Sequence, residues 1–218
     1  MIMRKTLLVA ATLLLSVCAD AQMAVGSWTL QPKAGVNIAS MTNAENGKVR
    51  LGLVAGAELG YQASPLLSIT AGAFYSQQGV NSDVDIYYKD SNPQPDVHVE
   101  STIKMDYVNV PILANFYVAD GLAVKMGIQP GFLINDKVEI SSNGVSAEMG
   151  LKESYRAANV DADIPSVDFA IPLCISYEFS NVVLDARYNL HLTNAISAMG
   201  ESTKHSVFQI TLGYKFKL

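Results

Sequence analysis

The sequence predicts an all-β, eight-stranded antiparallel transmembrane up-and-down β-barrel, and three observations carry this prediction. Eight stretches alternate apolar residues with small or polar residues, as strands with two different faces do. The seven gaps between them alternate between tiny and long, which is typical of a membrane barrel with short turns at one end and long loops at the other. Although 50% of the chain is hydrophobic, no segment beyond the N-terminal region approaches the roughly 20 apolar residues of a spanning helix.

The N-terminal residues are predicted to be an export signal. A basic pair, Arg4-Lys5, precedes an apolar stretch at 6–17 that is too short to span a membrane. Ala19-Asp20-Ala21 then fits the pattern of small residues at a signal-peptide cleavage site. We therefore expect residues 1–21 to be cleaved and residues 22–218 to form the barrel domain.

The chain has two cysteines, Cys18 and Cys174. Cys18 raises the alternative of a lipoprotein signal, but Val17 stands where a small residue normally precedes the lipidated cysteine. Cleavage leaves Cys174 alone, so no disulfide can form within the mature chain. We expect Cys174 to be a small packed side chain, with a reactive thiol as the alternative.

The first two strands are predicted at 28–38 and 50–62, with a polar loop at 39–49 between them. Even-numbered residues of the first strand and odd-numbered residues of the second are apolar, whereas the opposite faces are mostly polar or glycine. The tiny gap Ala63-Ser64-Pro65 then leads into the third strand. Its residues predict a tight turn.

The third and fourth strands are predicted at 66–78 and 105–118. Alternate residues of the third strand, from Leu67 to Tyr75, are apolar or aromatic, and even-numbered residues of the fourth, from Val108 to Val118, share one face. The second tiny gap, Ala119-Asp120-Gly121, follows the fourth strand.

The remaining four strands repeat the pattern at 122–135, 166–178, 182–191 and 205–218. The third tiny gap, Phe179-Ser180-Asn181, separates the sixth strand from the seventh. Strands of this length exceed the residues needed for a tilted crossing, about 9–11. An even number of strands brings both chain ends to the same side, which places the short turns in the periplasm and the long loops outside.

Aromatic residues cluster near the strand ends, as expected for rings at the two membrane interfaces. The alternative is that they belong to an ordinary β core. The set on the short-turn side is Trp28, Tyr61, Phe116, Tyr177, Tyr214 and Phe216, and the set on the long-loop side is Tyr75, Phe132, Phe169 and Phe208.

The chain resembles the small bacterial outer-membrane β-barrel family that includes PorT-like proteins, often labelled the porin family or outer membrane protein beta-barrel domain. The resemblance rests on the motifs at 107–113 (YVNVPIL), 127–133 (GIQPGFL) and 184–190 (LDARYNL), and on the aromatic strand at 207–218. It implies outer-membrane lipid and the barrel-assembly machinery as partners. The chain ends on leucine where such barrels commonly end on phenylalanine, so the resemblance places recognition by that machinery on the aromatic residues of the last strand.

Eight strands leave an interior that side chains can fill, so an open diffusion pore is not expected. We predict a polar network inside the barrel, with paired charges because an unpaired buried charge is costly. Its role is either a plug that holds the barrel shape or a gate that re-pairs to pass ions. The predicted members are Lys33, Glu58, Asn115, Lys125, Gln129, Asp185, Arg187 and Lys215.

The long loops at 79–101 and 136–165 are the candidate surface for an extracellular ligand, because loops of this length usually have a function or are disordered. The first is acidic and carries an Asp83-x-Asp85 pair, but it lacks the glycine and closing glutamate of a calcium-binding EF-hand loop. Solvated acidity is the preferred interpretation, and calcium binding is the alternative. Val84, Ile86, Tyr87 and Tyr88 also suggest strands that continue above the membrane.

Other functions are disfavoured by what the sequence contains. The net charge is −5 and no basic patch suggests nucleic acid. No phosphate-binding glycine loop or Cys/His metal cluster predicts a cofactor or metal. A lipid-modifying enzyme would need a paired serine and histidine, but His205 and Ser206 are adjacent on a strand and must point to opposite faces. We therefore expect no enzymatic activity.

Overall fold

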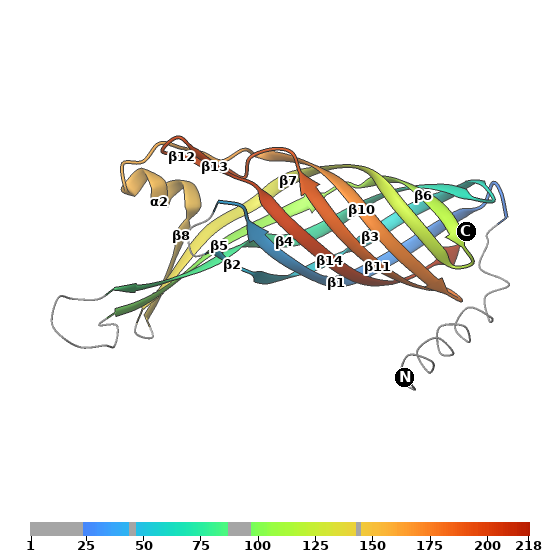
Figure 1. Cartoon of the computed structure of the whole chain (residues 1–218), viewed down its shortest axis with the longest axis horizontal. Helices are drawn as coiled ribbons and strands as arrows, with labels where there is room; N and C mark the ends of the chain where they lie inside the picture. The colour runs from blue at the N-terminus through green and yellow to red at the C-terminus, as the bar shows by residue number, and fades with distance from the viewer. Residues whose placement is uncertain (1–23, 44–46, 87–96, 143–144) are drawn as a thin grey trace, which may run out of the picture.

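The computed structural model describes residues 24–43, 47–86, 97–142 and 145–218, and most of them lie in one closed antiparallel barrel (Figure 1). The predicted signal peptide at 1–21 lies outside the described residues. The wall consists of β1 (Trp28–Met41), β3 (Arg50–Ser64), β4 (Leu67–Ile86), β5 (Val97–Asn109) continued by β6 (Ile112–Ala119), β7 (Leu122–Ser142), β10 (Val167–Phe179), β11 (Val182–His191) and β14 (His205–Tyr214) continued by β15 (Phe216–Lys217).

The ring closes between its first and last strands, because β1 pairs with β3 on one side and with β14 on the other. The β1–β14 register runs from Lys33 opposite Gly213 to Met41 opposite His205. Every neighbouring pair in the ring is antiparallel. The predicted eight-stranded up-and-down barrel is therefore confirmed.

The fourth strand is interrupted at Val110 and Pro111, where β5 ends and β6 begins. Proline has no N–H to donate to the ladder, which explains a break inside a strand that the alternation predicts as continuous. The carbonyl of Pro111 still accepts a hydrogen bond from the Gly72 amide at 3.0 Å, so the wall stays closed across the break.

The three tiny gaps are tight turns at one end of the barrel, as predicted. Residues in the left-handed region make two of them possible, with φ of 70° at Gly121 and 54° at Ser180. The C-terminus lies at this end (Figure 1).

At the opposite end, strands continue into the predicted loops, as the pattern at Val84 and Ile86 suggested. β4 and β5 stay paired out to Ile86 opposite Val97, and β7 runs on to Ser142. The described residues of the predicted loop at 79–101, which are 79–86 and 97–101, are therefore paired strands. Val84 and Ile86 lie in β4, whereas Tyr87 and Tyr88 fall outside the described residues.

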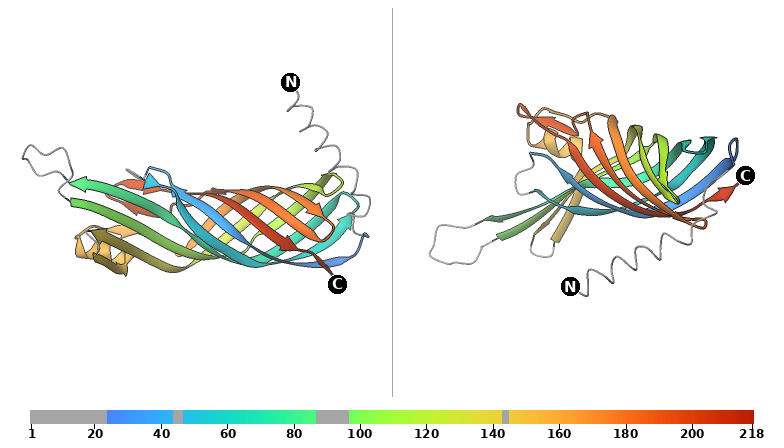
Figure 2. Two further views of the ribbon diagram at one scale, coloured as in Figure 1. Left: turned by 90° about the horizontal axis from the view of Figure 1, so that it is seen from below. Right: turned by 45° about the vertical axis from the view of Figure 1, so that its right-hand side comes forward.

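Several short elements complete this loop end, beside the projecting ends of β4, β5 and β7 (Figure 2). β8 pairs with β7, β2 pairs with β4, and β9, β12 and β13 form a small sheet of their own. Their bounds are β2 (Gly47–Lys48), β8 (Val145–Gly150), α2 (Leu151–Ala157), β9 (Ala162–Asp163), β12 (Ile196–Ala198) and β13 (Glu201–Thr203). Within the described residues, no helix has both the length and the apolar composition to cross a membrane.

The wall is apolar outside and polar inside, the reverse of a soluble barrel. Leu51 is 72% exposed and Leu212 is 59% exposed, whereas the charged Glu58 and Arg187 are 0% and 2% exposed. Apolar side chains facing outward around a closed ring match lipid surroundings, because hydrocarbon accepts only apolar groups and fully paired backbone.

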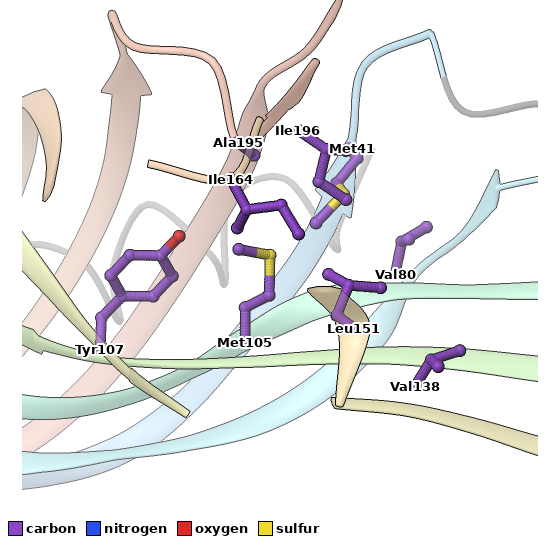
Figure 3. Packing of buried hydrophobic residues seen from close by; sticks show 9 residues of the cluster. All are labelled: Met41, Val80, Met105, Tyr107, Val138, Leu151, Ile164, Ala195 and Ile196. Atoms are coloured by element: carbon purple, nitrogen blue, oxygen red, sulfur yellow. The ribbon is translucent and has the colours of Figure 1, made fainter. Parts of the chain in front are cut away.

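An apolar cluster fills the loop end of the interior (Figure 3). Wall residues such as Met105 and Tyr107 meet Leu151 of α2, Ile164 after β9 and Ile196 of β12. Each of these three loop residues is at most 5% exposed. The short elements at the loop end are therefore packed onto the barrel by burial of apolar surface.

Candidate functional site

A chain of alternating charges crosses the barrel interior. Lys33 Nζ lies 2.6 Å from Glu58 Oε2 and 2.5 Å from Asp185 Oδ2, so it bridges two carboxylates. Asp185 Oδ1 accepts a second bond from Lys125 at 2.8 Å, and Glu58 Oε1 accepts one from Arg187 Nη2 at 2.9 Å. The order is Lys125, Asp185, Lys33, Glu58, Arg187, and it joins β7, β11, β1 and β3 across the lumen.

Arg187 extends this chain to neutral partners. Its Nε donates to the Cys174 sulfur at 3.1 Å, and its Nη1 donates to Gln129 Oε1 at 3.4 Å. The guanidinium carbon also lies 5.8 Å from the centre of the Phe74 ring, within the range of a cation–π contact. Cys174 is thus a packed interior side chain, as predicted. Its partner, Arg187, is one of the predicted lumen residues, but the sequence did not predict this contact.

Two glycines make room for the Phe74 ring inside the barrel. A Cβ on Gly56 would lie 2.7 Å from Phe74 Cδ1, and one on Gly72 would lie 3.0 Å from Phe74 Cε2. The sequence pattern could have indicated this packing, because Phe74 lies on the inward face of β4 and the glycines lie on the same inward face of the wall.

The eight predicted lumen residues divide into three groups instead of forming one layer. Lys33, Glu58, Lys125, Gln129, Asp185 and Arg187 belong to the central chain. Lys215 pairs with Glu178, and its Nζ lies 5.9 Å from the centre of the Tyr117 ring. Asn115 donates to Ser68 at 3.0 Å and to Thr70 at 3.4 Å.

A further polar group lies between the central chain and the apolar cluster. His191 Nδ1 is 2.5 Å from Asp168 Oδ2, and Thr193 donates to the other oxygen of the same carboxylate. The Tyr107 hydroxyl lies 3.1 Å from His205 Nε2, and the two histidine rings are 5.4 Å apart. The sequence did not predict this group because its members come from four different strands, β5, β10, β11 and β14, and from the segment after β11.

His205 and Ser206 lie on opposite faces of β14. His205 is buried against Tyr107, whereas the Ser206 hydroxyl is 3.1 Å from the outward Tyr188 hydroxyl. The prediction that these two side chains point to opposite faces of the strand is therefore confirmed.

Ion pairs also occur on the projecting hairpins. Lys104 Nζ lies 2.6 Å from Glu139 Oε2, and this hydrogen bond lowers the pKa of the exposed Glu139 carboxyl. Asp83 of the Asp-x-Asp pair is bound to Lys48. In the described ranges, no group of three or more His, Cys, Asp or Glu side chains is arranged to hold a metal ion.

Comparisons with known proteins match one protein family and several solved structures. The family model described as outer membrane protein beta-barrel domain matches residues 19–197. Among solved structures, the chain is similar to the attachment invasion locus protein Ail of Yersinia pestis, with 13% identity, a TM-score of 0.41, and coverage of 88% of this chain and 100% of Ail. It is also similar to Neisserial surface protein A, with 12% identity, a TM-score of 0.49, and coverage of 87% and 97%.

No curated protein matches the sequence at a significant level. The family match spans most of the chain and includes seven of the eight wall strands. The chain belongs to the outer membrane protein beta-barrel domain family.

Proposed function

We propose that this outer-membrane protein is a plugged barrel whose working surface is its extracellular loop end. In this proposal, residues 1–21 are a cleaved export signal, the tight turns face the periplasm, and the loop end faces outward. The lumen serves to hold the barrel rigid, and the protein has a structural or surface-interaction role without enzymatic activity.

The buried charge chain is the observation that carries this proposal. Its five charged side chains are each no more than 6% exposed, and each carboxylate binds two cations. Moving an ion past them would require separating charges that have little access to water, which is costly. The apolar cluster above the chain adds a second barrier at the loop end.

Single-channel recording tests the plug. The full chain, refolded into a planar lipid bilayer, is expected to show no steady conductance. The charge reversal Glu58→Lys is expected to leave the bilayer silent wherever the variant folds, with Glu148→Lys on exposed β8 as the matched control.

The second candidate is a narrow gated channel. It is favoured by Lys33, which bridges two carboxylates and so has an alternative partner when one bond opens. Wild-type openings that Glu58→Lys alters and Glu148→Lys does not would establish the gate and overturn the plug.

Protease treatment of intact cells tests the orientation. Lys152 and Arg156 are exposed on α2, so trypsin added outside is expected to cut there. Protection in intact cells together with cutting after the outer membrane is opened would reverse the proposed orientation.

A further inference from the structure

A cavity of about 340 Å³ opens at the loop end, above the apolar cluster of Figure 3. Its walls come from β1, β4, β5, α2, β12 and β13, so elements from distant parts of the sequence enclose it. Its size is within the range of small-molecule sites, about 300–1,000 Å³.

The surface of this cavity is mostly apolar, although Ser82 and Ser101 also line it. Met41, Val80, Ile103, Ile196 and Ala198 contribute side chains to it. The Thr203 hydroxyl, which also lines the cavity, is already directed at the carbonyl of Ile196 at 3.4 Å. An apolar or aromatic group would therefore be preferred to water against this wall.

One polar group at the wall comes from α2. The Tyr155 side chain lines the cavity, and burial raises the pKa of its hydroxyl. The hydroxyl consequently stays neutral and remains a hydrogen-bond donor and acceptor.

A second, acidic cavity of about 250 Å³ adjoins the first and shares Ala198 and Glu201 with it. Asp161 and Asp163 also line it. The small sheet brings these residues together, since Asp163 pairs with Ser197 and Ala198 pairs with Glu201. All three carboxylates are exposed, and none forms an ion pair with another described residue.

We propose that the joined cavities bind a cationic amphiphile, a compact molecule with a protonated amine on an apolar or aromatic body. The body lies against Met41, Val80 and Ile196, and the amine lies beside Glu201 and Asp163. The carboxylates attract the cation and repel an anion of the same shape. This inference rests on the proposed function, because it gives the loop end a ligand class.

Three water-soluble probes test the proposal: 4-phenylbutylamine, 4-phenylbutan-1-ol and 4-phenylbutyrate. They share a phenylalkyl chain and differ in the terminal group, which is an amine, a hydroxyl or a carboxylate. Binding is measured by calorimetry on the full chain in phosphatidylcholine nanodiscs at low salt, with empty nanodiscs subtracted. The amine is expected to bind about tenfold tighter than the alcohol, and the acid weaker than both.

Variants test the contributions of the acidic and the apolar cavity to binding. Glu201→Gln is expected to reduce the advantage of the amine over the alcohol at least threefold and to leave the affinity for the alcohol unchanged. Glu153→Gln, which removes an equal charge from exposed α2, is expected to change neither.

Ala198→Trp fills the wall that the two cavities share and is expected to abolish binding of all three probes. Ser101→Trp fills the same cavity from β5 if the first variant misfolds, and Ala147→Trp on exposed β8 is the control for bulk.

Equal affinity for amine and acid, or binding that survives both filling variants, would overturn the proposal. A barrel that stays silent in bilayers but binds none of the probes rejects this ligand class alone. A barrel that conducts rejects the plug whatever the probes do, so the two failures are distinguishable.

Discussion

At the scale of single residues, Glu58 holds two cations, Lys33 and Arg187, inside the barrel. It is fully buried, and it is the only carboxylate among the described residues that contacts Arg187 in an ion pair. Lys33 would keep Asp185 if Glu58 were lost, but Arg187 would keep only Gln129, Cys174 and the Phe74 ring.

Glu58→Ala is therefore expected to lower the free energy of unfolding by about 3–5 kcal/mol, because it leaves a buried cation without its counter-charge. Urea titration of the barrel in lipid vesicles measures this. Glu148→Ala is the control, since its exposed pairs with Lys104 and Lys137 should contribute less than about 1 kcal/mol. Equal losses in the two variants would show that the lumen charges are well solvated.

Gly56 is a second residue whose identity the packing requires. A Cβ there would lie 2.1 Å from the Ala73 carbonyl oxygen and 2.7 Å from Phe74 Cδ1, closer than real atoms approach. Gly56→Ala is expected to cost about 1–3 kcal/mol in the same titration, because backbone and ring must both move. Gly150→Ala, which meets only the flexible Glu153 carboxylate at 3.3 Å, should cost less, and a reversed order would contradict the interior position of Phe74.

At the scale of elements, α2 packs on the barrel through buried Leu151, with Tyr155 partly buried against the same cluster. Leu151 is the only buried residue of this helix, and it belongs to the apolar cluster at the loop end. No side chain caps the first turn, so intrinsic helix stability contributes little in seven residues.

Leu151→Ala is expected to release α2 while the barrel remains folded. Losing about 2 kcal/mol or more of local packing should speed tryptic cutting after Lys152 or Arg156 at least tenfold, since cutting follows the open population. Limited proteolysis of the refolded protein measures the rate, and heat-modifiable gel mobility reports the barrel. Leu192→Ala removes the same side chain at a position that is 55% exposed, and a comparable rate increase there would contradict the packing argument.

The wall strands were predictable from sequence because lipid outside and polar side chains inside impose one alternation on every strand. Alternation gives the face of a side chain but not its neighbour across the lumen, because strand tilt and stagger shift heights around the barrel. Lys215 therefore pairs with Glu178, which was not among the predicted members, and stands apart from the central chain. α2 and the small sheet at the loop end were not predicted, because their burial depends on single residues such as Leu151, Ile164 and Ile196 in otherwise polar segments.

At the scale of the whole molecule, one apolar band surrounds the barrel between two sets of aromatic residues. Trp28 and Tyr61 lie 5.0 Å apart near the tight turns, and Tyr214 and Phe216 lie 4.7 Å apart at the same end. Phe132, Phe169 and Phe208 are 40–50% exposed toward the loop end. Leu212 lies between these sets, opposite Ala34 of β1 and Leu184 of β11.

A charged side chain in this band should destabilise the barrel more, the deeper it lies in the bilayer. Leu212→Arg is expected to lower the free energy of unfolding from vesicles by about 2–4 kcal/mol, because an arginine near the bilayer midplane must leave water or deform the lipid. Leu192→Arg, on the exposed loop after β11, should cost no more than about 1 kcal/mol. Thinner bilayers should reduce the Leu212→Arg penalty and leave Leu192→Arg unchanged, since only the first side chain then moves closer to the interface. Equal penalties at both positions would mean that the aromatic sets do not mark the limits of the membrane.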